Sequence, residues 1–199
     1  MNVLVLSLNN AEKRREYMDL VLNKCNIKFR FVDSLSPKDI DSKLFENTPY
    51  YLSNEAVATF QTHIKALEVV KESGETTLIL EDDATPLYND VLTKLNLLLQ
   101  TEIDYDIILV GYQERNSGYK KNVSKEFSKQ GSFIGLHSYI IKPEKVDKIL
   151  SLLGEPNDHI DKKISNLISS NRLNGIFTKK KLFKQNTDFI SQIPKRKNL

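Results

Sequence analysis

Cysteine occurs only once in this 199-residue chain, at Cys25. A single cysteine cannot form a disulfide within the chain, so nothing in the sequence points to an oxidising compartment. Because Cys25 lies between Leu22 and Ile27, we expect it to be a small buried residue.

Long apolar runs are missing as well, since no stretch reaches the roughly 20 residues that a membrane-spanning helix needs. The opening run Val3–Leu6 is apolar, but it has neither a basic region before it nor a small-residue cleavage site. We predict that it is a strand and not a signal peptide. These absences together favour a cytoplasmic location.

Positive charges barely outnumber negative ones, and the net charge is only +3. The C-terminal end is nevertheless basic, at Lys179–Lys181, Lys184 and Lys195–Lys197. We interpret this cluster first as a solvated end, and second as a phosphate contact or a peripheral contact with a membrane surface. A nucleic-acid partner would depend on this end alone, so none is expected.

Glycine-rich phosphate motifs are absent too. Neither the G-x-G-x-x-G turn of dinucleotide-binding folds nor a P-loop follows the first predicted strand. The length, 40% hydrophobic content and 28% charged content are those of a soluble protein with one domain. We expect that domain over residues 1–193, followed by a basic tail over residues 194–199.

The hydrophobic pattern predicts an α/β fold with a mostly parallel central sheet flanked by helices. Asn9 or Asn10 is expected to cap the first helix, and Ser53 to cap a long helix that ends at Gly74. Residues 34–52 and 113–132 look irregular. Strands are predicted over residues 2–8, 27–32, 77–81, 105–110 and 138–142, with two more within 176–183; helices are predicted over 11–24, 54–73, 87–100, 143–153 and 158–172.

The most informative stretch is Thr77–Asp83, in which a short apolar run leads directly into Glu81, Asp82 and Asp83. Such a run is typical of a strand buried on both faces, and Pro86 should end regular pairing soon after it. The acids then lie at the carboxyl end of a central strand, where open α/β sheets bind ligands. Alternation would point Glu81 and Asp83 one way and Asp82 the other.

Three adjacent carboxylates repel one another unless something compensates their charge. A hard divalent cation would do so, because Mg²⁺ and Mn²⁺ prefer oxygen ligands. The alternative is a solvated acidic turn where the strand meets a loop, and the local pattern does not decide between the two. Arg14 and Arg15 lie in the first turn of a predicted helix, where the dipole disfavours cations, which hints at an anionic ligand.

Four segments of the chain resemble glycosyltransferase family 25, the lipooligosaccharide and collagen galactosyltransferase group. The segment Leu78–Asp83 is the most specific of them, and the match spans the chain from Val3 to about Ile193. The segments are Val5–Asn9 with Glu12–Arg15, Leu52–Glu55 with Thr62–Leu67, Leu78–Asp83, and Gly135–Ile141 with Pro156–Asp158. The chain departs from the family pattern at Val57–Ala58, at Thr62 in place of serine and at Asn157 in place of valine.

The resemblance implies a single Rossmann-like domain of the GT-A type and transfer of a hexose, most often galactose, from a UDP-sugar. The acceptor would be a hydroxyl on a glycan, a lipid-linked molecule or a protein. It further implies Mn²⁺ or Mg²⁺ at Glu81 and Asp83. The donor-binding residues that it implies are Leu8, Asn9, Arg14, Asp33, His63 and Asp82. Taken alone, His63 would more often be a surface or interface histidine. For Asp33, a turn carboxylate is an equally good interpretation.

An inverting transferase needs a carboxylate base, and the resemblance makes Asp158 the first candidate and Asp161 the second. Asp158 could equally be a helix cap. Two other functions stay open: a catalytically silent relative that binds a nucleotide sugar or glycan, and a metal-dependent nucleotidyltransferase.

Overall fold

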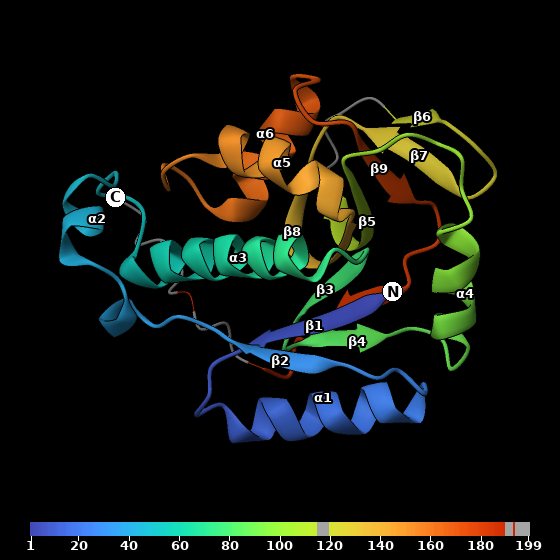
Figure 1. Ribbon diagram of the computed structural model, residues 1–199, viewed down its shortest axis with the longest axis horizontal. Coiled ribbons are helices and arrows are strands. Elements are labelled where there is room, and N and C mark those ends of the chain that lie inside the picture. The colour runs from blue at the N-terminus through green and yellow to red at the C-terminus, as the bar shows by residue number, and fades with distance from the viewer. Residues whose placement is uncertain (115–119, 190–192, 194–199) are drawn as a thin grey trace.

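The fold is built on one mixed sheet of eight strands in the order β2-β1-β3-β8-β5-β9-β7-β6 (Figure 1). The computed structural model describes residues 1–114, 120–189 and 193, so the predicted basic tail and part of the predicted loop 113–132 lie outside the described residues. The strands are β1 (Asn2–Ser7), β2 (Arg30–Asp33), β3 (Thr77–Glu81), β5 (Ile107–Glu114), β6 (Lys120–Asn122), β7 (Phe127–Gln130), β8 (Phe133–Ile141) and β9 (Gly175–Thr178). A separate antiparallel pair joins β4 (Ala84–Pro86) to β10 (Phe183–Gln185).

Most strands of the sheet point the same way. β1 pairs in parallel with β2 and β3, and β5 pairs in parallel with β9. Only β8 and β7, among the described strands of this sheet, run in the opposite direction. The predicted α/β fold with a mostly parallel sheet is therefore confirmed, and the carboxyl ends of β2, β1 and β3 meet at one edge.

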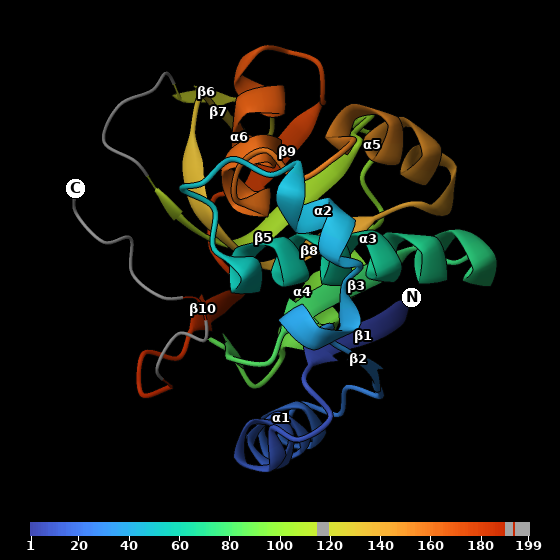
Figure 2. The same cartoon turned by 90° about the vertical axis from the view of Figure 1, so that its left-hand side faces the viewer.

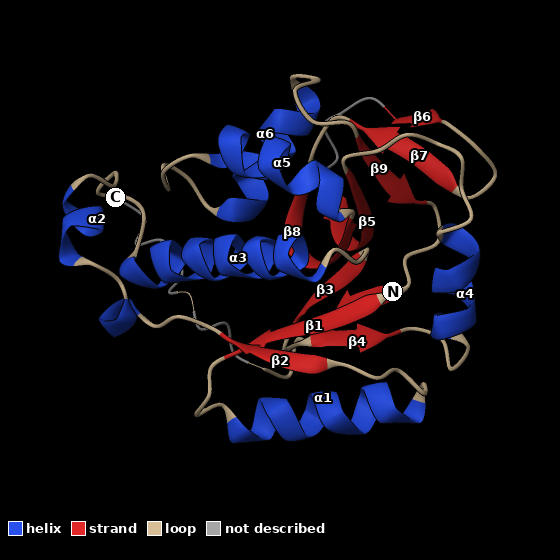
Figure 3. Ribbon diagram, in the orientation of Figure 1, coloured by secondary structure: helices blue, strands red, loops and turns tan. Residues whose placement is uncertain are grey.

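Helices cover both faces of the sheet (Figure 3). They are α1 (Glu12–Lys24), α2 (Ser42–Glu46), α3 (Asn54–Ser73), α4 (Val91–Leu98), α5 (Val146–Leu153) and α6 (Ile160–Ser169). α3, α5 and α6 lie on one side, and α1 and α4 on the other (Figure 1).

Alternation along the strands produces the two cores between these layers. Leu4, Leu6 and Ile79 pack toward α3, α5 and α6, whereas Val5 and Leu80 pack toward α1 and α4. A strand with apolar residues on both faces must be central, because each face needs its own helical cover.

The long helix α3 has the boundaries that its sequence predicts. Ser53 Oγ accepts a hydrogen bond from the Ala56 amide (3.2 Å) at its start. Gly74 adopts φ 65° at its end, which glycine does without steric cost. Cys25 is buried, as expected.

Several predicted boundaries are wrong. Neither Asn9 nor Asn10 caps α1, whose N-cap is Ala11 without a side-chain hydrogen bond. β2 begins at Arg30 and not at Ile27, because α1 ends in a turn that includes Asn26 at φ 55°. Pro86 is the last residue of β4, so pairing does end there, but β4 itself was not expected. α6 begins at Ile160, after His159 at its N-cap.

The strands β5 and β8 are longer than predicted. β5 continues through Gly111, and β8 begins at Phe133. Their register shifts on both sides of Gly111, so the pair is held together across an irregularity that period-two patterning does not reveal. Within the described residues, no helix combines the length and apolar character that crossing a membrane requires.

Gly111→Ala is expected to lower the free energy of unfolding by about 1–3 kcal/mol, as overpacking of a tight interior does. A Cβ at this position would lie 2.1 Å from Ser138 Oγ and 2.6 Å from His137 Nε2. Urea denaturation of wild type and variant measures the change. Gly74→Asn is the control, because a Cβ there meets nothing within 4 Å and asparagine tolerates a left-handed C-cap. Equal losses in both variants would contradict the close approach at Gly111.

Candidate functional site

A cavity of about 380 Å³ opens at the carboxyl edge of β1 and β3. Its floor holds Glu81, Asp82 and Asp83, so the acids lie where the strand pattern predicts them. One wall is a face of α3 that includes Glu55, Thr59 and His63. The segment Ser34–Pro37, residues 134–136 of β8 and the start of α6 at residues 159–161 also line the cavity. Figure 2 faces this side of the molecule, where α3 and α6 lie near one another.

Asp82 is buried and forms an ion pair with Arg14 of α1. Ser7 Oγ at the end of β1 donates a second hydrogen bond to Asp82 Oδ2 (2.7 Å). Burial raises the pKa of Asp82, and Arg14 and Ser7 offset part of that rise. Asp82 is therefore held by the protein itself, through both of its oxygens.

Asp83 is buried beside it but is less well compensated. Its Oδ2 accepts a hydrogen bond from Gln185 Nε2 (3.2 Å) and lies 3.6 Å from Arg14 Nη1. Its Oδ1 is buried and has no hydrogen-bond partner among the described residues. Burial, followed by the nearby charge of Glu81, raises the pKa of Asp83 to about 7. An incompletely satisfied carboxylate at a cavity is a typical feature of a ligand site.

Glu81 faces the opposite side of the strand, toward α3. Its Oε1 lies 3.4 Å from His63 Nε2, and His63 Nδ1 lies 2.8 Å from the Tyr139 hydroxyl. Burial raises the pKa of Glu81, but the contact with His63 and the nearby charge of Arg14 outweigh it, so the pKa lies below its ordinary value. His63 is 1% exposed, so the surface or interface interpretation of this residue is wrong.

The two arginines of α1 find their anions within the protein. Arg14 pairs with Asp82 and packs its guanidinium 4.9 Å from the centre of the Phe189 ring. Arg15 pairs with Asp33 and donates hydrogen bonds to the carbonyl oxygens of Ser7 and Leu8. Carboxylates at the ends of β3 and β2 therefore compensate the two arginines, which the helix dipole alone would disfavour at the start of α1.

The predicted site residues divide into two groups. Leu8, Arg14, His63, Glu81, Asp82, Asp83 and Asp161 line the cavity. Asn9, Asp33 and Asp158 are not among its lining residues. The Asp33 side chain is 62% exposed and pairs with Arg15. The cavity wall where we expected Asp33 is formed by the neighbouring segment Ser34–Pro37.

The two candidate bases differ in their surroundings. Asp158 Oδ1 accepts the His159 amide (2.8 Å) and lies 4.0 Å from Lys162 Nζ. Asp161 Oδ2 accepts the Gly135 amide (2.9 Å), which links the start of α6 to β8 beside the cavity. We predicted that Asp158 or Asn157 caps this helix, and neither is its N-cap.

Sequence reasoning missed three groups that shape the site. Ser7 could have been found from strand register, because its neighbour Leu6 pairs with Glu81. Thr62 Oγ1 accepts the Leu35 amide (2.9 Å) and so positions the segment Ser34–Pro37. The hydroxyl of Tyr139 on β8 carried no local signal, because its contact with His63 spans 76 residues.

Comparison with known proteins decides the family. Residues 1–164 match the model of glycosyltransferase family 25, described as a lipopolysaccharide biosynthesis protein. The chain belongs to glycosyltransferase family 25. A search of curated proteins finds no match.

Three solved structures resemble this family 25 chain in fold. A glycosyltransferase involved in glycosylation of the major capsid of PBCV-1 is 12% identical, with a TM-score of 0.50 and 92% of each chain covered. That likeness supports the expected GT-A-type fold. A197 from STIV is 16% identical (TM-score 0.47, covering 98% of this chain and 99% of that one). An apo UDP-glucose pyrophosphorylase is 12% identical (TM-score 0.49, covering 93% and 74%).

Asp83→Asn is expected to raise the free energy of unfolding at pH 8, measured with a chelator present. The folded protein binds a proton at Asp83 near pH 7, whereas the unfolded chain binds it near pH 3.9. Between these values the folded state holds more protons, so this group lowers stability as pH rises. The gain in the variant should therefore grow from about pH 4 to pH 7, up to a ceiling of about 4 kcal/mol at about 1.4 kcal/mol per pKa unit.

The matched control is Asp19→Asn, which changes an exposed carboxylate on α1. It should leave the pH dependence of stability as in wild type. If Asp83→Asn were destabilising at pH 8 by more than it is at pH 4, the assignment of a strained, buried carboxylate would be wrong.

Proposed function

We propose that this protein is a metal-dependent hexosyltransferase that moves galactose or glucose from a UDP-sugar to a hydroxyl acceptor with inversion. The acceptor is a glycan, a lipid-linked molecule or a protein. The observation that carries the proposal is the position of Glu81 and Asp83 in the cavity of a family 25 chain, with Asp83 Oδ1 buried and unpartnered. A cation bound to the donor phosphates would supply the missing partner of Asp83 Oδ1.

The residues fit a divalent cation that is bound partly by the protein and partly by the substrate. No group of three histidine, cysteine, aspartate or glutamate side chains within the described ranges could hold a metal ion on its own. Mg²⁺ sites often use one or two carboxylates, with phosphate and water oxygens as the other ligands. Asp83 and Glu81 would hold the ion, and it would stabilise the charge that develops on the leaving diphosphate.

Cationic and polar groups of the chain would bind the rest of the donor. Arg14 lies beside both aspartates and would contact the diphosphate. Leu8 and the segment Ser34–Pro37 provide a partly apolar wall at the end of β1 and β2, suited to the nucleoside. Asn9 and Asp33 stay predictions as donor contacts, and would need to approach from outside the cavity lining.

The acceptor hydroxyl must lose its proton to a base as the new bond forms. Asp158 and Asp161 both remain candidates, and the position of Asp161 in the cavity lining supports the second. Asp161 already accepts the Gly135 amide through Oδ2, which fixes its orientation relative to β8. The acceptor would then lie between α6 and the acids of β3.

One observation favours the alternative of a silent donor-binding relative. Arg14 pairs with Asp82 and lies near Asp83, so the protein itself compensates part of the charge that a cation would compensate. Such a relative would bind a UDP-sugar without turnover. Peripheral membrane contact through the basic C-terminal end stays a prediction, and Lys195–Lys197 lie outside the described residues.

Release of UDP from a panel of UDP-sugars is expected with Mn²⁺ and not with a chelator. Asp83→Asn should reduce it at least a hundredfold, because the cation loses a ligand and the leaving diphosphate its stabilisation. Asp19→Asn should release UDP as wild type does. Donor binding by calorimetry without turnover in the presence of an acceptor library would favour the silent relative. Absence of both would overturn the proposal.

Asp161→Asn and Asp158→Asn separate the two candidate bases. The variant that removes the base should lose about a hundred- to ten-thousand-fold in kcat with donor affinity unchanged. The variant that alters only the start of α6 should lose up to about 1 kcal/mol of stability and little activity. Steady-state kinetics and urea denaturation of both variants provide the comparison. Wild-type kcat in both would place the base elsewhere.

A further inference from the structure

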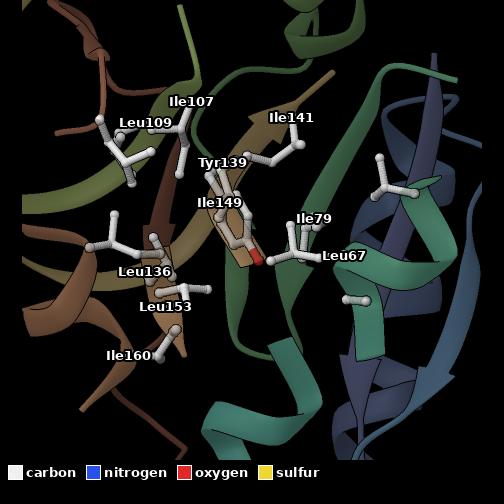
Figure 4. Close-up of a cluster of buried hydrophobic side chains, with 14 of the residues drawn as sticks. Leu67, Ile79, Ile107, Leu109, Leu136, Tyr139, Ile141, Ile149, Leu153 and Ile160 are labelled. Atoms are coloured by element: carbon white, nitrogen blue, oxygen red, sulfur yellow. The ribbon is translucent and has the colours of Figure 1, made fainter. Parts of the chain in front are cut away.

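Tyr139 and His63 form a buried polar contact that the proposed chemistry does not yet use. Tyr139 is 2% exposed, and its ring lies in the apolar cluster with Leu67, Ile79 and Ile149 (Figure 4). His63 reaches its hydroxyl from α3, the helix that also carries Leu67, with 2.8 Å between Nδ1 and the hydroxyl oxygen. Neither side chain can turn to water, so their protons must be placed within the protein.

The hydroxyl proton of Tyr139 has one acceptor within the part of the chain that the structure describes, His63 Nδ1. Burial, and then the charge of Glu81, raise the pKa of Tyr139 well above its ordinary value, so the hydroxyl keeps this proton. If Nδ1 carried a proton of its own, the Tyr139 proton would be buried without a partner. An unsatisfied buried donor is costly, so Nδ1 should be the acceptor.

The other ring nitrogen leads to the same conclusion. His63 Nε2 is buried, lines the cavity side of α3 and lies 3.4 Å from Glu81 Oε1. It makes no hydrogen bond of good geometry to a described residue. A bare nitrogen lone pair facing a carboxylate would be repulsive, whereas an N–H group facing it would be attractive. The hydrogen bond at one ring nitrogen determines what the other can do.

We propose that Tyr139 is a positioning residue that acts through His63. By donating to Nδ1 it keeps the His63 proton on Nε2, and this N–H group orients Glu81 through Oε1, leaving Oε2 for a cation. The role of Glu81 toward a cation rests on the proposed function, but the placement of the His63 proton does not. Tyr139 thus begins a series of side-chain contacts that runs from β8 through His63 of α3 to Glu81 at the end of β3.

The placement of the proton is tested directly on the wild-type protein without donor or metal. Long-range ¹H–¹⁵N correlation spectra distinguish protonated from unprotonated ring nitrogens near neutral pH. His63 is assigned with His137→Gln and His159→Gln, which remove the signals of the other two histidines. A proton on Nε2 alone is expected. A proton on Nδ1, with or without one on Nε2, would overturn the proposal.

Tyr139→Phe removes the donor while keeping the ring in its apolar cluster. His63 should then show a mixture of tautomers, and Mn²⁺ binding measured in the presence of UDP should weaken about tenfold, as loss of an outer hydrogen bond at a metal site typically does. The matched control is Tyr112→Phe, which removes a buried hydroxyl that donates to the Thr178 carbonyl elsewhere in the sheet. It should leave both measurements unchanged.

A double-mutant cycle with His63→Gln tests whether Tyr139 acts through His63. The glutamine amide carries its own N–H donors, so Tyr139→Phe should weaken Mn²⁺ binding no further in this background. An equal loss in both backgrounds would overturn the positioning role. If wild type bound no Mn²⁺ at all, the proposed metal site would fail, and the tautomer spectrum would still decide the role of Tyr139.

Discussion

The ion pair between Arg14 and Asp82 is the interaction on which the arrangement of the site depends. A carboxylate at the end of a strand buried on both faces is expensive unless a partner compensates its charge. Arg14 supplies that charge from the first turn of α1, and Ser7 supplies a hydrogen bond from β1. The position of α1 and the register of β1 against β3 are therefore tied to one buried acid.

The three acids are divided between the two layers of helices because the strand ends among them. Glu81 is the last residue of β3 and faces α3, where His63 lies against it and Tyr139 contacts the other ring nitrogen of His63. Asp82 and Asp83 lie in the turn after the strand, and Arg14 of α1 contacts both. Arg14 is thus shared by two of the acids, and of the three only Asp83 keeps an unpaired buried oxygen.

Much of this could be predicted from local patterns. The β3 run, the cap of α3 at Ser53 and the stop at Gly74 all follow from short-range physics, and the family resemblance held over residues 1–164. Predictions failed where a distant segment supplied the partner. His63 was expected at a surface or an interface, and it is buried because it meets Tyr139 of β8. No periodicity within one element carries that information.

The sequence did not reveal α2, β4, β6 or β7. By itself, it determined the α/β class, most of the other strands and helices, and the place of the acids at the carboxyl edge of β3. Each of these depends on hydrophobic spacing and backbone preference over a few neighbouring residues. The tertiary structure decided which charges are compensated, which oxygen of Asp83 is left unpaired and which ring nitrogen of His63 meets Tyr139. These depend on groups that are distant in sequence and meet only when the layers pack, because electrostatic and hydrogen-bond energies are set by a few ångströms of separation.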